Sequence, residues 1–384
     1  MPEAARVVDT VSRLVGFDTT SRNSNLDLIA HARTILEGLG ARVRLTYDDS
    51  RTKANLLATL GPDTDGGYVL SGHTDVVPVD GQDWSSDPFR AEAREGKLYG
   101  RGTADMKGFV GACLALAPEF ARRDLKRPVH FAFSYDEEVG CVGVGRLIAD
   151  LKEAGIKPAL AVIGEPTEMR VVGAHKAGAG FRTRITGREG HSSAPHKGAN
   201  AVMMAGEFLG HLAALQAELK RDADPRFDPP YTTIQANVIS GGTALNILAR
   251  QCEVTWEYRS LPGRGDDLAA RVAAHVEKAI LPKYRAQAKE AAIETRTLAT
   301  YPGLAFEPDS PAVQLARACT GANEVDVVAY GTEAGLFQRA GIPAVVCGPG
   351  SIDQAHKADE FVELSQLAAC ETFLRKLADH AARR

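Results

Sequence analysis

The sequence predicts an α/β protein made of two domains, one of them inserted into the other. Short apolar runs alternate with segments of helical spacing, which indicates a mostly parallel sheet covered by helices on both faces. A middle stretch instead alternates strictly between apolar and polar residues, which is typical of half-buried antiparallel strands. Its elements follow one another as β-α-β-β-α-β, the pattern of a ferredoxin-like α+β domain.

The larger domain begins with an amphipathic helix that carries Val7, Val11 and Leu14 on one face. Buried strands are then expected at residues 54–60, 68–72, 129–135 and 160–166, with helices at 106–123 and 142–155. A last buried strand is expected at 342–350, and a final helix at 363–380. This order favours a parallel sheet in the large domain.

The inserted domain has its clearest strand at residues 250–259. Cys252, Val254, Trp256 and Tyr258 alternate there with polar residues. Similar runs occur at 180–187, 232–240 and 293–300, and helices fit at 199–219 and 266–281. Glycine-rich turns at 173–180 and 300–303 mark where the chain passes between domains. We therefore predict a large domain at 1–177 and 302–384, with an inserted domain at 178–301.

Composition and charge exclude several classes of protein. A hydrophobic fraction of 44% in 384 residues is enough for a sizeable core. The net charge of −4 leaves no basic excess for nucleic acid, and no run of about 18 apolar residues predicts a membrane helix. The N-terminus lacks the layout of a signal peptide. The six cysteines are scattered, which suggests a reducing cytoplasmic compartment and no cysteine-bound metal.

Ionisable side chains gather where the predicted strands of the large domain end. They are His73 and Asp75 after the strand at 68–72, Asp105 at a helix start, Asp136, Glu137 and Glu138 after 129–135, Glu165 within 160–166, and His356 after the last strand. Ligands of open α/β sheets bind beyond the carboxyl ends of the strands. We therefore expect these segments to converge on one edge.

Each of these residues has an ordinary explanation when it is taken alone. Asp105 suits a helix cap, Glu165 an ordinary loop acid, and His356 a solvated loop. The pair His73 and Asp75 fits a hydrogen-bonded core histidine as well as a metal ligand with its orienting carboxylate. None of these residues identifies a site by itself.

The combination favours a metal centre. Carboxylates gathered at one apolar edge resist ionisation, and a bound cation removes that cost. Two histidines with three carboxylates suit zinc or another first-row divalent ion. They divide evenly over two metal ions roughly 3.5–4 Å apart that share one bridging acid. A single metal ion is the alternative.

Six motifs make the chain similar to a known family. They are GHTDVVPVDGQDW, LYGRGTADMKG, DEEVG, GEPT, GREGHSS and QAHKADEFV, in this order. They resemble the dinuclear-zinc amidohydrolase/exopeptidase family, and the resemblance runs from the first helix to the last. It implies a di-zinc peptidase-like catalytic domain, an inserted lid and dimerisation domain, and hydrolysis of small N-acyl amino acids. The alternative, a non-catalytic binding protein on the same fold, would be expected to have lost a ligand or the base, and none is missing.

The resemblance also implies a role for each residue. His73 and Glu165 would bind one zinc, Glu138 and His356 the other, and Asp105 would bridge the two. Asp75 would fix the tautomer of His73, and Glu137 would be the general base. Neighbouring side chains of an extended chain point in opposite directions, so Glu137 and Glu138 could serve different purposes. Co²⁺ could replace Zn²⁺.

The resemblance extends to the inserted domain and to the last strand. His191 would reach the active site of the partner in a homodimer and stabilise the oxyanion. Asn246 and Arg259 would contact the substrate, and the backbone at Gly348 and Gly350 could bind its carboxylate. A strand-end ion pair is the alternative for Arg259. For Glu333 the sequence leaves two roles open, a contact with a substrate amine or support of its loop.

Overall fold

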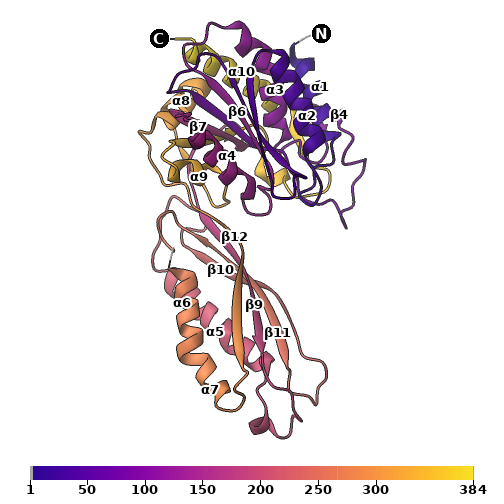
Figure 1. Cartoon of the computed structure of the whole chain (residues 1–384), viewed down its shortest axis with the longest axis vertical. Helices are drawn as coiled ribbons and strands as arrows, with labels where there is room; N and C mark the ends of the chain where they lie inside the picture. Colours follow the sequence, from indigo (N-terminus) through magenta and orange to yellow (C-terminus); the bar gives the residue numbers. More distant parts are fainter. Residues whose placement is uncertain (1–2, 266, 384) are drawn as a thin grey trace. The chain divides into compact units, whose positions relative to one another are not determined.

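The computed structural model describes residues 3–265 and 267–383 (Figure 1). Its contacts divide the chain into two compact units. The first contains the chain up to Ala174 together with Leu304–Val327 and the residues from Thr332 onward. The second contains His175–Gly303 and Val328–Gly331. Residues 1–2 and 384 of the predicted large domain, and residue 266 of a predicted helix, lie outside the described residues.

Within the described residues, the first unit holds a sheet of eight strands. Their order is β1 (Arg42–Tyr47), β2 (Ala54–Leu60), β6 (Val129–Ser134), β3 (Tyr68–His73), β7 (Leu160–Pro166), β14 (Ala344–Gly348), β8 (Val172–His175) and β13 (Asp326–Val328). The central strands β6, β3, β7 and β14 are parallel. Antiparallel pairs flank them, because β2 runs against β1 and β6, and β8 against β14. The mostly parallel sheet is thus parallel at the centre, where the site residues lie.

Helices cover both faces of this sheet. They are α1 (Glu3–Val15), α2 (Leu26–Gly38), α3 (Lys107–Arg122), α4 (Val142–Glu153), α8 (Pro311–Thr320), α9 (Ala334–Arg339) and α10 (Leu364–Ala381). On β3, Gly72 faces Phe109 and Val110 of α3, so closely that a Cβ would meet Val110 at 2.9 Å. The preceding Ser71 hydrogen-bonds Glu333, just before α9. Successive strand residues face opposite sides, so α3 and α9 lie on opposite faces.

A small sheet joins two distant parts of the first unit. It is formed by β15 (Phe361–Glu363), β5 (Lys97–Tyr99) and β4 (Glu92–Arg94), in this order. Phe361 pairs with Tyr99, and Glu363 with Lys97. The segment that precedes Asp105 is therefore fastened to the segment that follows His356.

The second unit is a four-stranded antiparallel sheet in the order β10-β11-β9-β12. Its strands are β9 (Ala177–Thr186), β10 (Thr233–Gly241), β11 (Gln251–Ser260) and β12 (Ala292–Tyr301). Its helices are α5 (Ala201–Leu219), α6 (Leu268–His275) and α7 (Leu281–Arg285), and a π-helical turn, Val276–Ile280, joins the last two. Element order and strand order are those of a ferredoxin-like domain, as predicted.

The predicted alternation on β11 is confirmed: Cys252, Val254, Trp256 and Tyr258 are buried, and the residues between them are not. The Trp256 ring stacks on Phe181 with centroids 4.4 Å apart. Its Nε1–H donates to Thr183 Oγ1 at 2.9 Å. The strand therefore supplies the aromatic core of the second unit. Among the described residues, no helix is long and apolar enough to cross a membrane.

Candidate metal centre

The site lies where the parallel strands of the first unit end. His73 is the last residue of β3, and Glu165 is the penultimate residue of β7. Glu138 follows β6 by four residues, His356 follows β14 by eight, and Asp105 precedes α3 by two. Parallel neighbours end on the same edge of a sheet, so the topology brings these five residues together, as the sequence predicts.

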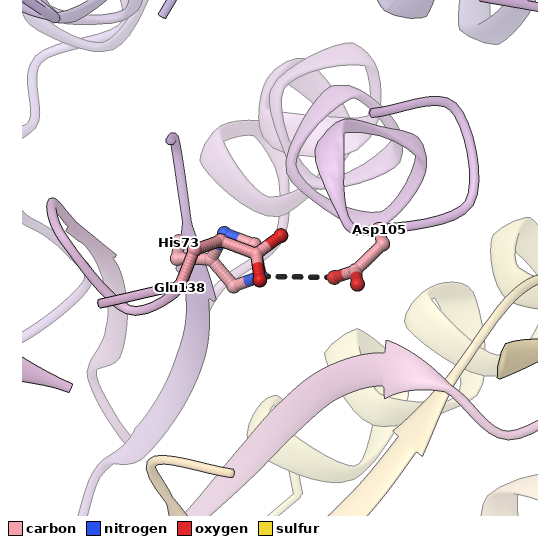
Figure 2. A group of neighbouring side chains, drawn as sticks. All are labelled: His73, Asp105 and Glu138. Atoms are coloured by element: carbon pink, nitrogen blue, oxygen red, sulfur yellow. Dashed lines mark hydrogen bonds and ion pairs between the residues drawn. The ribbon is translucent and has the colours of Figure 1, made fainter. Parts of the chain in front are cut away.

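Asp105 is at the centre of the group. Its Oδ1 lies 3.0 Å from His73 Nε2, the contact drawn in Figure 2. Its Oδ2 lies 3.4 Å from His356 Nε2. One carboxylate thus presents its two oxygens to two different imidazoles, which is the arrangement of a bridging ligand.

Each histidine also has an acid of its own. Glu165 Oε1 lies 3.8 Å from His73 Nε2, and Glu138 Oε2 lies 3.0 Å from His356 Nε2. Ligand atoms of His73, Asp105 and Glu138 lie within 4.8 Å of one another, and so do those of His73, Glu137 and Glu165. The second group contains Glu137, so distance alone does not separate the predicted base from the predicted ligands.

The donor set fits divalent cations. The Glu138 Oε1 atom is buried and has no hydrogen-bond partner among the described residues. Burial, with the charge of Asp105 next, raises the pKa of Glu138 to about 7 and that of Glu165 well above its ordinary value. Burial likewise raises the pKa of Glu137. A cation among these oxygens would satisfy the unpaired atom and relieve the repulsion.

The neighbouring carboxylates shift the pKa values of the two histidines in turn. Burial would lower the pKa of His73, but the hydrogen bond to Asp105 and the charge of Glu165 raise it well above its ordinary value. Hydrogen bonds to Asp105 and Glu138 raise the pKa of His356 to about 10. Burial opposes ionisation of Asp105, yet the two histidines hold its pKa well below its ordinary range. Without metal, protonated imidazoles balance the carboxylates.

Asp75 orients the site differently from the prediction. The His73 Nδ1 atom has the backbone carbonyl of Asp75 at 2.9 Å, whereas the Asp75 carboxylate is 3.7 Å away. That carboxylate accepts instead from the N–H groups of Glu137, at 3.0 Å, and Glu138, at 3.3 Å, and from the Ser21 hydroxyl, at 2.7 Å. The ring of His73 is thus oriented by the backbone carbonyl of Asp75, and the Asp75 side chain positions the two glutamates.

The local geometry of these glutamates also corrects the sequence argument. Glu137 and Glu138 lie in a turn, not in extended chain, and the Glu137 carbonyl accepts from the N–H groups of Gly140 and Cys141 at 2.8 Å. Asp136 has a left-handed φ of 55°. The two side chains nevertheless point in different directions: Glu137 accepts from Cys141 Sγ at 3.3 Å, whereas Glu138 faces His356. The separation results from the turn.

Three predicted residues belong to the second unit. His191 is exposed, and its Nδ1 lies 2.7 Å from Ser193 Oγ. The carbonyl of Asn246 accepts from Ser192 N–H at 3.1 Å, which joins the two loops. Arg259, at the end of β11, forms an ion pair with Glu257 at 3.0 Å. This contact is the strand-end ion pair that was the alternative for Arg259. The catalytic and substrate-binding roles of these three residues stay predictions.

The GPGS turn is engaged within the first unit. The Gly348 N–H donates to Thr167 Oγ1 at 3.2 Å, which argues against the prediction that it binds a substrate carboxylate. Gly350 has a φ of 89° and accepts from Glu168 N–H through its carbonyl at 2.7 Å. The role of its N–H stays a prediction.

Two buried acids lie next to the site: the sequence leaves two roles open for Glu333 and gives none for Glu360. Glu333 is 1% exposed and accepts from the hydroxyls of Ser71 and Ser134, so it supports the strands and not a substrate amine. Burial raises its pKa to about 7. Glu360, also 1% exposed, holds the backbone around Asp105. An acid four residues after His356 was visible in the sequence, but its contacts depend on tertiary structure.

Comparisons with known proteins agree with this geometry. Residues 69–380 match the model of "Peptidase family M20/M25/M40". Acetylornithine deacetylase of Proteus mirabilis is 36% identical over 94% of this chain and 92% of its own, and that of Myxococcus xanthus is 35% identical over 97% and 96%.

Solved structures share the fold. An M20 family metallo-carboxypeptidase from Sulfolobus solfataricus superposes with a TM-score of 0.78 at 16% identity, over 100% of this chain and 99% of its own. A dinuclear metal binding peptidase of this family from Bacillus subtilis does so with a TM-score of 0.64 at 16% identity, over 98% and 97%.

Proposed function

We propose a function from one premise: the chain belongs to peptidase family M20/M25/M40. It is a metal-dependent hydrolase. The proposed reaction is removal of the acetyl group from N2-acetyl-L-ornithine, which gives ornithine and acetate in arginine biosynthesis. Relatives that carry the name acetylornithine deacetylase, 34–36% identical over nearly the whole chain, support this substrate. N-Succinyl-diaminopimelate or a broader range of N-acyl amino acids is the alternative.

The position of Asp105 between His73 and His356 carries the proposal. His73 and Glu165 would hold one ion, Glu138 and His356 the other, and Asp105 both. Two Zn²⁺ ions, or two Co²⁺ ions in their place, suit these nitrogen and oxygen donors. When bound, such ions polarise a carbonyl and lower the pKa of water.

Glu137 is the proposed general base. It takes a proton from the attacking water and delivers it to the leaving amine. The Asp75 carboxylate accepts from the backbone N–H of Glu137 at 3.0 Å, and burial raises the pKa of Glu137. A raised pKa suits both halves of this task, because a carboxyl group must gain and lose the proton near neutral pH.

A homodimer through the second unit is part of the proposal. Val238 and Ile239 on β10 are 59% and 53% exposed, and Met203 on α5 is 63% exposed. β10 is an edge strand of its sheet. An exposed apolar edge strand is a template for pairing with a second chain. The partner's copy of His191 would then stabilise the oxyanion, as the family resemblance implies.

Parallel assays test the substrate. The zinc-loaded chain should hydrolyse N2-acetyl-L-ornithine with a kcat/KM at least about tenfold above that for N-succinyl-L,L-diaminopimelate, because a pocket shaped for one acyl group discriminates by roughly 1–3 kcal/mol. Metal-free protein serves as the control. A preference for the succinyl substrate would replace the proposed substrate, and activity without metal would overturn the mechanism.

Mixed dimers test the partner contribution. His191→Ala and Glu137→Gln chains should each be nearly inactive. If His191 acts in the partner's site, a mixed dimer has one intact site, and random mixing should restore about a quarter of wild-type activity. No recovery in verified mixed dimers would place His191 in its own subunit's site or outside catalysis.

A further inference from the structure

The carboxylate of Glu360 is buried beneath the loop that delivers Asp105. Within the part of the chain that the structure describes, it accepts four hydrogen bonds. Oε1 accepts from the N–H groups of Ala104, at 2.9 Å, and Asp105, at 3.0 Å. Oε2 accepts from the N–H of Gly102, at 3.0 Å, and from Arg101 Nη1, at 2.8 Å. One side chain therefore satisfies three backbone N–H groups of a single turn and a buried guanidinium.

This turn depends on an acceptor in that position. Gly102 has a φ of 85°, and a Cβ there would lie 2.8 Å from Val76. The backbone therefore bends sharply against the core, with its N–H groups turned inward. Removing the Glu360 carboxylate would leave these donors buried without partners, which is unfavourable enough to reshape the turn. The side chain of Asp105 would move with it.

The same network holds the loop that carries His356. Arg101 Nη1 also donates to the carbonyl of Lys357 at 3.2 Å, and Arg101 Nη2 donates to Gln82. Gln82 Nε2 in turn donates to the carbonyl of His356 at 2.8 Å. His356 has a left-handed φ of 64°, which a residue other than glycine adopts only when its surroundings require it. Gln82 and Arg101 provide that restraint.

We propose that Glu360, together with Arg101, is a positioning residue that fixes Asp105 and His356 relative to each other, so that the second ion finds its ligands already placed. The inference rests on the metal centre proposed above. His73 and Glu165 lie on strands and are 1% and 4% exposed, whereas the His356 side chain is 56% exposed and lies on a loop. Loss of the network should therefore weaken the second ion more than the first.

Metal titration of stripped protein tests this inference. Glu360→Gln keeps the size of the side chain but replaces one acceptor oxygen with an NH₂ group. Two of the four N–H donors then face another donor in place of an acceptor. We expect the second Zn²⁺ or Co²⁺ to bind about 10- to 100-fold more weakly, and the first to weaken by a smaller factor because Asp105 contacts both halves of the site. In the loaded enzyme, kcat should fall at limiting metal and recover with excess metal.

Glu371→Gln is the matched control. Glu371 is a 5% exposed glutamate of α10, paired with Arg375 at 3.2 Å and not part of the site. It should alter thermal stability without changing either metal affinity. Equal affinities for both ions in Glu360→Gln and wild type would overturn the inference, as would equal weakening in Glu360→Gln and the control.

Gln82→Ala gives an independent measurement if Glu360→Gln fails to fold. This half-buried side chain contacts the His356 loop directly and reaches the Asp105 turn only through Arg101. Its removal should weaken the second ion selectively by several-fold, and an unchanged second affinity would overturn the proposal. A wild-type chain that binds no metal would contradict the proposed function instead, so the two failures are distinguishable.

Discussion

Replacing Glu137 by Gln should abolish turnover while both metal ions stay bound. The neighbouring Glu138→Gln variant should behave in the opposite way, losing the second ion and regaining activity as metal is added. The two residues are adjacent in sequence and both lie half-buried at the site, so each serves as the matched control for the other.

The contacts of each side chain set the expected size of the effects. Glu137 contacts Cys141 Sγ at 3.3 Å, and its backbone N–H is held by Asp75, so an isosteric amide should leave the fold intact. Loss of a general base costs about 10²- to 10⁴-fold in kcat, or about 3–5 kcal/mol of barrier. Glu138 instead lies 3.0 Å from His356 Nε2, so its variant removes a ligand oxygen.

The assay combines metal analysis with steady-state kinetics on N2-acetyl-L-ornithine. For Glu137→Gln we expect two ions per chain, a KM close to wild type and a greatly reduced kcat, because the lost interaction acts only in the transition state. For Glu138→Gln we expect one ion per chain at limiting metal. Thermal unfolding of both variants checks that the fold is retained.

The opposite result is clearly recognisable. Glu137 belongs to a cluster with His73 and Glu165 that could itself hold an ion. If Glu137→Gln loses metal while Glu138→Gln keeps two ions and loses kcat, the assignments are exchanged. If Glu137→Gln retains near-normal kcat, proton transfer by this residue is refuted.

Further predictions concern the metal, the charges and the core. Chelation should silence the enzyme, and Zn²⁺ or Co²⁺ should restore it; activity after complete stripping would contradict this. In metal-free protein, Asp105→Asn should lower the pKa of His356 from about 10, measured by NMR titration, because it removes the first of its two carboxylate partners; an unchanged pKa would contradict the bridging contact. Burial raises the pKa of Glu333 from 4.5 to about 7, so the folded chain keeps a proton that the unfolded chain releases, and stability should fall between these pH values as pH rises, by up to about 3 kcal/mol. Glu333→Gln should lack this part of the fall in denaturant unfolding measured across that range, and identical pH dependence would contradict it. Trp256→Ala should destabilise the second unit by about 3–5 kcal/mol in denaturant unfolding and leave metal binding unchanged; a loss of metal would contradict the separation of the two units.

The sequence could predict that the proposed ligands converge, because their positions follow from topology. His73 and Glu165 terminate apolar runs that are recognisable as strands, and parallel strands end on one edge. The alternation around Trp256 likewise identifies β11 without any tertiary information. Periodicity and strand order are local or nearly local properties, so they can be recognised from the sequence alone.

What the sequence could not provide depends on turns and long-range contacts. Short edge elements such as β15 carry no periodicity, and β15 forms only because it meets the distant strand β5. The carboxylate of Asp75 reaches a turn 62 residues later, so this partner could not be read from spacing. The turn at Glu137 contradicted an argument from extended chain for the same reason: its conformation is set by backbone hydrogen bonds to Gly140 and Cys141.

The two halves of the site are built in different ways, and this determines which substitutions should weaken metal binding. The half around His73 and Glu165 is part of the sheet: His73 pairs with Ser134 of β6, and Glu165 directly precedes Pro166, which pairs with Gly348 of β14. The half around His356 lies on a loop, and its backbone adopts an unfavourable φ. A ligand on a loop binds an ion tightly only if the protein already holds it in the binding position before the ion arrives. Glu360 and Arg101 supply this preorganisation through the backbone around Asp105 and His356, without being proposed ligands themselves, so a substitution there should resemble the loss of a ligand although every proposed ligand is present.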